Sequence, residues 1–257
     1  MTLAGSATNA PETGGRNHGW QRGQQVKWTS TATNKLLLEA GIGTYLSDWN
    51  TRERPGNLTR DLVRVVEQCS AGCAANGNIP GLTYRSQTTD LFSDGRNKNV
   101  TTTWRASVSF VSGSKSLKIG YQGSLLGDIR SANRGANDLR YRVNNGVANQ
   151  FTMFIHEFQN DLWMRDDGFY ANGQWTMNKL TLQGGLRFDR AWSYSPDQTI
   201  GVTNFLASPL SFARADGVNY KDISPRMGVA WDVFGNGKTA VKVNAGRYED
   251  QIGRAHV

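Results

Sequence analysis

The chain has 257 residues, a hydrophobic content of 38%, 29 glycines and only 6 prolines. Its formal net charge of +8 at pH 7 comes from Lys and Arg residues that are spread along the sequence without a basic run, which argues against a nucleic-acid-binding protein. No run of about 20 apolar residues is present, which excludes a transmembrane helix but not membrane-spanning strands, because such strands alternate in polarity. The first residues, Met1–Gly15, lack the basic and apolar regions of a signal peptide.

The first predicted strands form a hairpin over residues 24–45, with a short turn near 31–34. In the second of these strands, leucine and isoleucine alternate with smaller or more polar residues, which is the two-residue period of a strand with one apolar face. A polar segment near 46–99 follows and predicts a long loop. Within it, residues 58–68 carry the apolar spacing of one short helical turn.

The second predicted hairpin spans residues 100–125 and turns near 112–115. Trp104 and further apolar residues share one face of its first strand, and Arg105 and two serines share the other. A second long loop is expected near 127–166.

Two further hairpins complete the predicted series. The third spans residues 169–189 and turns near 178–179, and a third long loop is expected near 192–222. The fourth hairpin, Tyr220–Tyr248, shows the clearest alternation and has an Asn-Gly pair in its turn at 235–237. Such a pair favours a type I′ turn, which needs positive φ angles.

Short and long connections therefore alternate along the chain. Loops of this length count against a compact soluble domain, whereas outer-membrane barrels combine short periplasmic turns with long extracellular loops. Strands of about 10–12 residues suit a tilted strand that crosses a bilayer, and aromatic residues near the strand ends fit the interfacial girdles of such barrels. The predicted fold class is all-β, with antiparallel up-and-down hairpins that form part of a transmembrane β-barrel, an open curved sheet of about eight strands.

Four segments resemble the barrel of TonB-dependent outer-membrane receptors. They are LKIGYQG (117–123), YRVNNGVANQ (141–150), LTLQGGLRFDRAWSYSP (180–196) and DISPRMGVAWDVFGNGKTAVKVNAGRY (222–248). The last is the most specific, because it joins a strand, a turn and a strand in one register. The similarity covers roughly residues 100–250 and is strongest to the Oar-like receptors, which carry a carboxypeptidase-regulatory-like domain.

This resemblance implies a barrel of about 22 strands with a plugged lumen. It implies a place in the bacterial outer membrane, contact with the lipid of that membrane, and energy supplied by the TonB complex of the inner membrane. The substrate is not identified by any motif. The sequence shows no TonB box and no plug, so the resemblance implies that these lie upstream and that residues 1–251 are a partial barrel domain. Residues 252–257, IGRAHV, are what a common sequencing adapter encodes when it is read in frame, and we expect them to be foreign to the barrel.

The alternation along the strands divides the residues of the wall into two sets. We expect the apolar set to face lipid and the polar set to line the lumen or contact the plug, where it would set polarity rather than perform chemistry. The candidate lumen-facing residues are Arg105, Lys118, Gln122, Gln183, Arg187, Arg226, Lys242 and Asn244.

Residues suited to covalent or metal chemistry are few. Cys69 and Cys73, in the first long loop, would form a disulfide in an oxidising exterior or stay a pair of free thiols, and a metal site lacks further ligands nearby. The histidines His18, His156 and His256 are isolated, and no catalytic triad is indicated. The sequence predicts neither an enzyme nor a cofactor.

Three classes of function fit the pattern: an active transporter, a passive porin or adhesin barrel, and a soluble β-sandwich module that binds carbohydrate. Strand pattern alone does not separate the first two. The asymmetry of the loops argues against a sandwich, which predicts comparable loops at both ends.

Overall fold

The computed structural model of the chain contains strands, turns and irregular connections, and no α-helix occurs in the part that it describes. No helix within this part is therefore long and apolar enough to cross a membrane. Residues 252–257 lie outside the described part. The structure describes residues 3–4, 8, 15–53, 62–73, 75, 77–84, 91–92, 97–133, 139–154 and 158–248.

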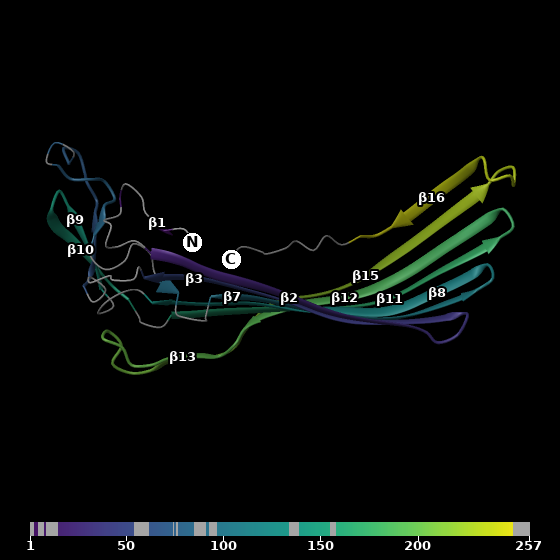
Figure 1. Cartoon of the computed structure of the whole chain (residues 1–257), viewed down its shortest axis with the longest axis horizontal. Helices are drawn as coiled ribbons and strands as arrows, with labels where there is room; N and C mark the ends of the chain where they lie inside the picture. Colours follow the sequence, from purple (N-terminus) through teal and green to yellow (C-terminus); the bar gives the residue numbers. More distant parts are fainter. Residues whose placement is uncertain are drawn as a thin grey trace.

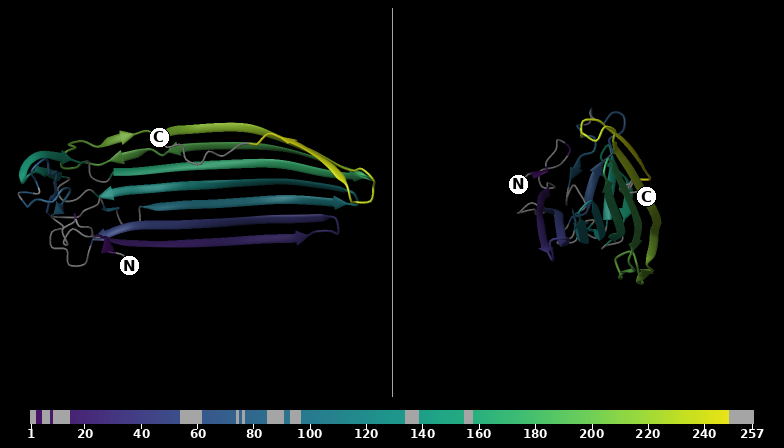
Figure 2. Two further views of the ribbon diagram at one scale, coloured as in Figure 1. Left: turned by 90° about the horizontal axis from the view of Figure 1, so that it is seen from above. Right: turned by 90° about the vertical axis from the view of Figure 1, so that its right-hand side faces the viewer.

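One antiparallel sheet dominates the structure (Figures 1 and 2). Its long strands follow the order β2-β3-β7-β8-β11-β12-β15-β16, so each pairs with the long strand before and after it in the sequence. The two-residue strands β1 (Leu3–Ala4) and β6 (Leu91–Phe92) join it at β2 and β8. The long strands are β2 (Gly15–Thr31), β3 (Leu36–Glu53), β7 (Lys98–Ser112), β8 (Lys115–Asn133), β11 (Phe158–Met177), β12 (Leu180–Ser195), β15 (Ala215–Asp232) and β16 (Ala240–Gly246).

Tight turns join the long strands at one end of the sheet (Figure 1, right). In the last turn the carboxylate of Asp232 accepts hydrogen bonds from the backbone N–H groups of Gly235 and Gly237, both at 2.9 Å. These glycines have φ angles of 72° and 71°, and Gly113 and Asn178 have 56° and 50° in two other turns. Glycine and asparagine tolerate such left-handed angles, so these residues fix where the last three hairpins reverse.

The long strands extend beyond the boundaries that the sequence indicates. β2, β3, β8 and β11 contain 17, 18, 19 and 20 residues, whereas a strand needs only about 9–11 residues to cross a bilayer. The extra residues lie at the end opposite the tight turns, in segments where the sequence predicts loops. Both faces of the strands carry mixed polar and apolar residues there, so the two-residue period that reveals a strand is lost.

The helical turn expected at 58–68 is wrong for the residues that the structure describes. β4 (Arg64–Glu67) is a strand, which pairs antiparallel with β5 (Thr83–Tyr84) and parallel with β9 (Leu139–Asn144). Pairing with a segment far away in the sequence decides the conformation of β4, and local apolar spacing carries no sign of such pairing.

Two smaller sheets are built from the long connections. β4, β5, β9 and β10 (Val147–Met153) form a four-stranded sheet, which we call the loop module. It lies at the end of the molecule away from the tight turns (Figure 1, left). β13 (Gln198–Ile200) and β14 (Leu210–Phe212) form a two-stranded sheet in the third long connection.

Within the described part of the chain, nothing covers the apolar face of the main sheet. Ile119 and Leu186 on this face are 53% and 54% exposed. The buried hydrophobic residues of the described part, Val65, Cys73 and Val143, all belong to the loop module and its disulfide turn. A soluble sandwich would cover this face with a second sheet, so the soluble β-sandwich alternative is wrong, and the open apolar face suits a wall in contact with lipid.

Glycines allow aromatic rings to lie flat against neighbouring strands. A Cβ atom added at Gly123 would lie 2.6 Å from the ring of Trp104, on the apolar face. One added at Gly120 would overlap the ring of Tyr170, on the polar face. Both faces of the wall thus use glycine to admit a bulky cross-strand neighbour.

The sheet is open and curved (Figures 1 and 2). β2 has only the short β1 on its outer side, and β16 has no further partner among the described residues. The expected class, an antiparallel all-β sheet of up-and-down hairpins, is confirmed.

Candidate functional site

The strand register gathers the polar side chains on one face of the main sheet. Arg105 pairs with Gln122, and Arg187 pairs with both Tyr170 and Ser224. Paired residues of antiparallel strands point to the same face. By this register the same face carries Arg105, Lys118, Gln122, Gln183, Arg187, Arg226, Lys242 and Asn244.

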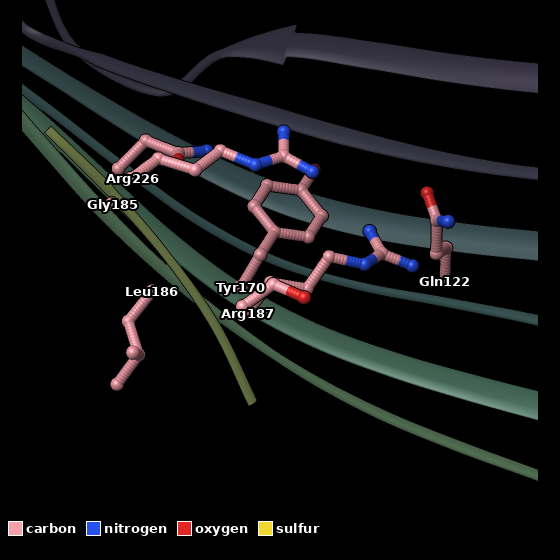
Figure 3. Close-up of a pocket in the computed structure, with 8 residues that line it drawn as sticks. Gln122, Tyr170, Gly185, Leu186, Arg187 and Arg226 are labelled. Carbon is pink, nitrogen blue, oxygen red and sulfur yellow. The ribbon is translucent and has the colours of Figure 1, made fainter. Parts of the chain in front are cut away.

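A pocket on this polar face brings three of these residues together: Gln122 from β8, Arg187 from β12 and Arg226 from β15. Figure 3 shows that they project to one side of the sheet together with Tyr170, whereas Leu186 projects to the other. The pocket is lined by Gln122, Tyr170, Asn172, Gly185, Leu186, Arg187, Ser224 and Arg226.

Arg187 is the most highly connected side chain of the pocket. Its Nε atom donates to Asp189 at 2.8 and 2.7 Å, and its terminal nitrogen forms an ion pair with the same carboxylate at 2.6 Å. With its amide oxygen turned toward Arg187, Gln122 accepts hydrogen bonds from both terminal nitrogens at 3.2 and 2.7 Å. Arg187 is therefore held by β8 and β12 together, and its charge is partly compensated.

A second polar cluster surrounds Glu39 on β3. Its carboxylate pairs with Lys118 at 3.0 Å and with Lys27 at 3.6 Å, and accepts a hydrogen bond from Ser107 at 3.4 Å. These side chains are partly exposed, so the pairs contribute only about 0–1 kcal/mol each to stability. Their effect is to give the face a compensated, water-compatible charge pattern.

The eight candidate residues do not form one site. Gln183 donates to Gln174 at 3.1 Å, away from the pocket. Lys242 and Asn244 lie on the edge strand β16, where both are exposed. The eight residues are spread over the polar face from β7 to β16, as expected for the lining of a barrel wall. They do not converge on a single ligand site.

Sequence reasoning missed several residues of this face. Tyr170 and Asn172 line the pocket and belong to the strand expected at 169–177, so assigning the two faces of that strand would have identified them. Glu39 is also missed, although it faces two lysines. Its polar surroundings are visible only once β2, β3 and β8 are aligned.

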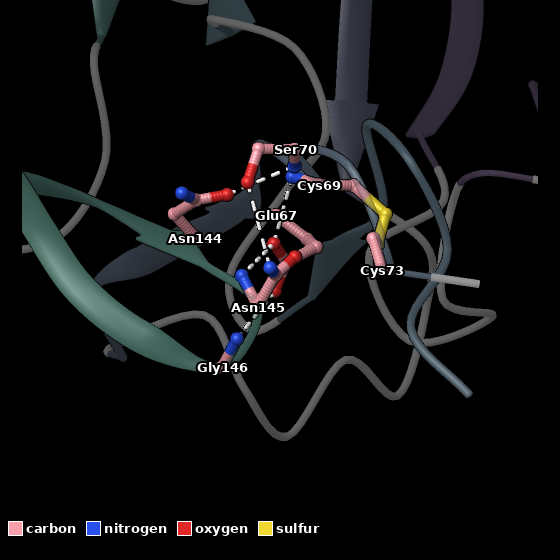
Figure 4. The surroundings of a disulfide bond; sticks show 7 residues. All are labelled: Glu67, Cys69, Ser70, Cys73, Asn144, Asn145 and Gly146. Atoms are coloured by element: carbon pink, nitrogen blue, oxygen red, sulfur yellow. Dashed lines mark hydrogen bonds between the residues drawn. A yellow bond between two sulfur atoms is a disulfide. The ribbon is translucent and has the colours of Figure 1, made fainter. Parts of the chain in front are cut away.

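The loop module is organised around the carboxylate of Glu67, which is 3% exposed (Figure 4). It accepts hydrogen bonds from the backbone N–H groups of Cys69 at 2.8 Å, Asn145 at 2.8 Å and Gly146 at 3.1 Å. Burial raises the pKa of this carboxyl group, but the three N–H groups outweigh that effect and hold the pKa below its ordinary value near 4.5. An ionised Glu67 therefore joins the first long connection to the second.

Cys69 and Cys73 lie next to Glu67, and the structure joins them by a disulfide (Figure 4). Their Cα atoms are 5.1 Å apart, within the range that disulfides adopt. The three side chains also have the spacing of a metal-ligand group, but a disulfide leaves no thiolate to bind a metal. Oxidation of the pair in the protein stays a prediction, and counting alkylated thiols by mass spectrometry tests it.

Strands β9 and β10 of the loop module expose large apolar side chains. Tyr141 and Phe151 are opposite each other in the β9–β10 register and are 40% and 60% exposed. Met153 follows on the same strand and is also exposed. The side chains of His18, His156 and His256 lie outside the described part.

The open sheet, with an apolar face toward its surroundings, a polar inner face and loops gathered at one end, defines a segment of a membrane-spanning β-barrel wall. The chain belongs to the family of the outer membrane beta barrel domain, which it matches over residues 2–256. It is a protein of the bacterial outer membrane, and the predicted class and location are confirmed.

Comparison with solved structures finds two outer-membrane transporters that are similar to the chain. The outer membrane transporter YddB from Escherichia coli is similar with a TM-score of 0.52 and 16% identity, over 96% of this chain and 28% of that chain. The FrpB iron transporter from Neisseria meningitidis gives a TM-score of 0.41 and 14% identity, over 86% of this chain and 27% of that chain. The chain thus spans less than a third of either transporter. The similarity to YddB shows the fold alone. Comparison with curated proteins gives no match.

Proposed function

We propose that the chain is part of the barrel of a TonB-dependent outer-membrane transporter of the Oar-like subset. The resemblance of four segments to such receptors supports TonB-dependent uptake. The similarity of the fold to an outer membrane transporter supports a transporter barrel. The proposed role is uptake of a substrate through the barrel, without enzymatic chemistry.

The polar face is the observation that carries this proposal. Its charges are paired across three strands around Glu39 and are paired again at Arg187 and Asp189. A barrel of about 22 strands encloses a lumen too wide for side chains to fill, and such lumens hold a plug. A lining of compensated charges and amides allows a folded plug to dock through hydrogen bonds without burying unpaired ions.

The eight candidate residues then have a positioning role. Arg187 and Gln122 would stiffen the wall, whereas exposed Lys242 and Asn244 would contact the plug. The loop module and the β13–β14 sheet would contact substrate on the extracellular side. The inner-membrane TonB complex would act through a region upstream of this segment.

Channel recordings on the complete receptor that contains this segment separate the proposal from a passive porin. A plugged transporter in a planar bilayer shows no steady conductance, and it opens when mild denaturant unfolds the plug. Steady ohmic conductance of the untreated protein contradicts the proposal and favours the porin.

TonB dependence requires its own measurement. The complete receptor should bind the purified periplasmic domain of TonB from the same bacterium, and an excess of a peptide copied from the receptor's own N-terminal segment should compete. Failure to bind, with a folded barrel confirmed by its heat-dependent gel mobility, rejects the TonB partnership and leaves the adhesin alternative.

A further inference from the structure

A cluster of cations and aromatic rings lies on the apolar, outward face of the main sheet, away from the polar site. It lies on β11, β12 and β15, just beyond the part of each strand whose outward residues are apolar. In the register Phe169 pairs with Phe188, Asp167 with Arg190, and Arg165 with Trp192. Lys221 of β15 pairs with Arg190 from the other side. All these residues point to the outward face.

The depth of this cluster in the membrane follows from β12. The outward residues of Leu180–Phe188 are only Leu, Gly and Phe, and Arg190 is the first outward charge. A tilted strand uses about 9–11 residues to cross the hydrocarbon layer, and this stretch has nine. It starts at a tight turn, so Arg190 lies at the opposite boundary, where the outer leaflet has its headgroups.

The cations of the cluster outnumber its carboxylates. Arg165 pairs with Asp167 at 3.2 Å and leaves its side chain 44% exposed. Arg190 lies 4.5 Å from the centroid of the Trp192 ring, and its Nε atom is buried without a hydrogen-bond partner. Lys221 is exposed. Three cations therefore meet one carboxylate at the membrane boundary.

Trp192 also holds the two arginines close to each other. The guanidinium carbon of Arg165 is 5.3 Å from the centroid of the same ring that Arg190 covers, and 5.6 Å from that of Trp104. Trp104 in turn donates to the hydroxyl of Tyr121 at 2.9 Å, and that hydroxyl donates to Asp167. The rings fix both guanidinium groups in a rigid patch that has an apolar border on the side of the bilayer.

We propose that Arg165, Arg190 and Lys221, arranged by Trp192, bind a phosphate group of a phosphorylated glycolipid of the outer leaflet. An uncompensated guanidinium beside the hydrocarbon layer is costly, and a phosphate satisfies its planar fork better than any neutral group does. Tryptophan is suited to the interface because its ring is apolar and its N–H is polar. Acyl chains of the same lipid would lie on Phe169 and Phe188 below.

Binding of defined lipids to the complete receptor in detergent tests this proposal. Tryptophan fluorescence and native mass spectrometry would follow titration with bisphosphorylated lipid A, lipid A without phosphates, and inorganic phosphate. We expect removal of both phosphates to weaken binding roughly tenfold or more. Equal binding of the two lipids overturns the proposal. A response to inorganic phosphate that matches the response to lipid A assigns the site to a soluble anion and overturns the choice of a lipid.

Substitutions then locate the site. The double variant Arg165→Ala/Arg190→Ala should lose the preference for the phosphorylated lipid, and Lys221→Ala, which removes an exposed side chain, should weaken it partly. The matched control is Lys115→Ala, because Lys115 is also a cation on a tryptophan, 4.7 Å from the ring centroid of Trp175, but lies at the opposite boundary. Equal loss in the control and in Lys221→Ala, or no loss in either cluster variant, contradicts the assignment.

Discussion

Glu67 shows how one side chain can organise a loop region that has almost no core. Its carboxylate accepts three backbone hydrogen bonds, two of them from the turn at Asn145 and Gly146. That turn has φ angles of 54° and 80°, which suit the Asn-Gly pair. Hydrogen bonds to an ionised carboxylate are among the strongest available. The geometry of the module therefore depends on the charge of Glu67.

This dependence predicts a loss of order in acid. The fold holds the pKa of Glu67 below 4.5, so its contribution to stability is complete above about pH 4.5 and disappears as the pH falls through the lower folded-state pKa. Hydrogen exchange of the Asn145 and Gly146 amides, corrected for intrinsic rates, should lose protection over this range. Glu67→Gln should already be less protected at pH 6 and show no such step. Identical pH profiles of both proteins contradict the role of Glu67.

Gly120 illustrates a second constraint at the scale of the residue. A methyl group there would overlap the ring of Tyr170, which lies across the polar face. We expect Gly120→Ala to destabilise the assembled barrel by about 1–3 kcal/mol, the usual cost of overpacking. Gly184→Ala is the control, because nothing lies within 4 Å of its added Cβ atom. Denaturant midpoints of the two variants in lipid vesicles give the comparison, and equal midpoints would show that Tyr170 moves aside freely.

The strands differ in how much of them the sequence could reveal. Within Leu180–Phe188 of β12, Leu and Phe alternate with polar residues except at the Gly184-Gly185 pair, and this region was predictable with the correct faces. Beyond Phe188, rings and charges share the outward face, so periodicity gives no strand signal although β12 continues to Ser195. β4 was not predictable, because its parallel partner β9 is far away in the sequence and no local rule selects that pairing.

The candidate site was likewise only partly predictable from the sequence. Alternation placed Arg105, Gln122 and Arg187 on one face, but only the register shows that Gln122 and Arg187 meet. The pairing of Glu67 with a turn in another loop left no trace in spacing or composition. Long-range neighbours of this kind are a property of the assembled sheet.

Within the hydrocarbon layer, each strand of the wall should tolerate charge on one face only. Val108 points outward and is 44% exposed, whereas its neighbour Ser107 points to the polar face and contacts Glu39. Val108→Arg should cost about 2–4 kcal/mol and reduce assembly of the complete receptor, as a charge facing mid-bilayer does. Ser107→Arg should assemble normally, because the new cation projects from the polar face, where its charge stays hydrated. The amount of folded receptor in outer-membrane fractions, determined by heat-dependent gel mobility, measures the assembly of both variants. Equal assembly of the two variants would refute the assignment of faces.

At the scale of the whole molecule, the open edges decide what the segment can do by itself. β16 pairs with β15 from Asp232 to Arg226 and has no partner on its other side among the described residues. Free strand edges bind other chains, and the uncovered apolar face adds a large hydrophobic surface. Neither feature is compatible with a stable monomer in water.

The 257-residue chain, refolded without lipid or detergent, should therefore form aggregates or large oligomers. Its apolar face would be buried between copies, and edge strands such as β16 would pair with one another. Light scattering coupled to size-exclusion chromatography measures the size of these particles. The control is the same chain in detergent micelles, which cover the apolar face but leave the strand edges open. A dispersed species in micelles would assign aggregation mainly to the apolar face, and persistent oligomers there would assign it to the edges. A monodisperse monomer that melts cooperatively in plain buffer would show that the segment is an independent soluble domain, contrary to its reading as part of a barrel wall.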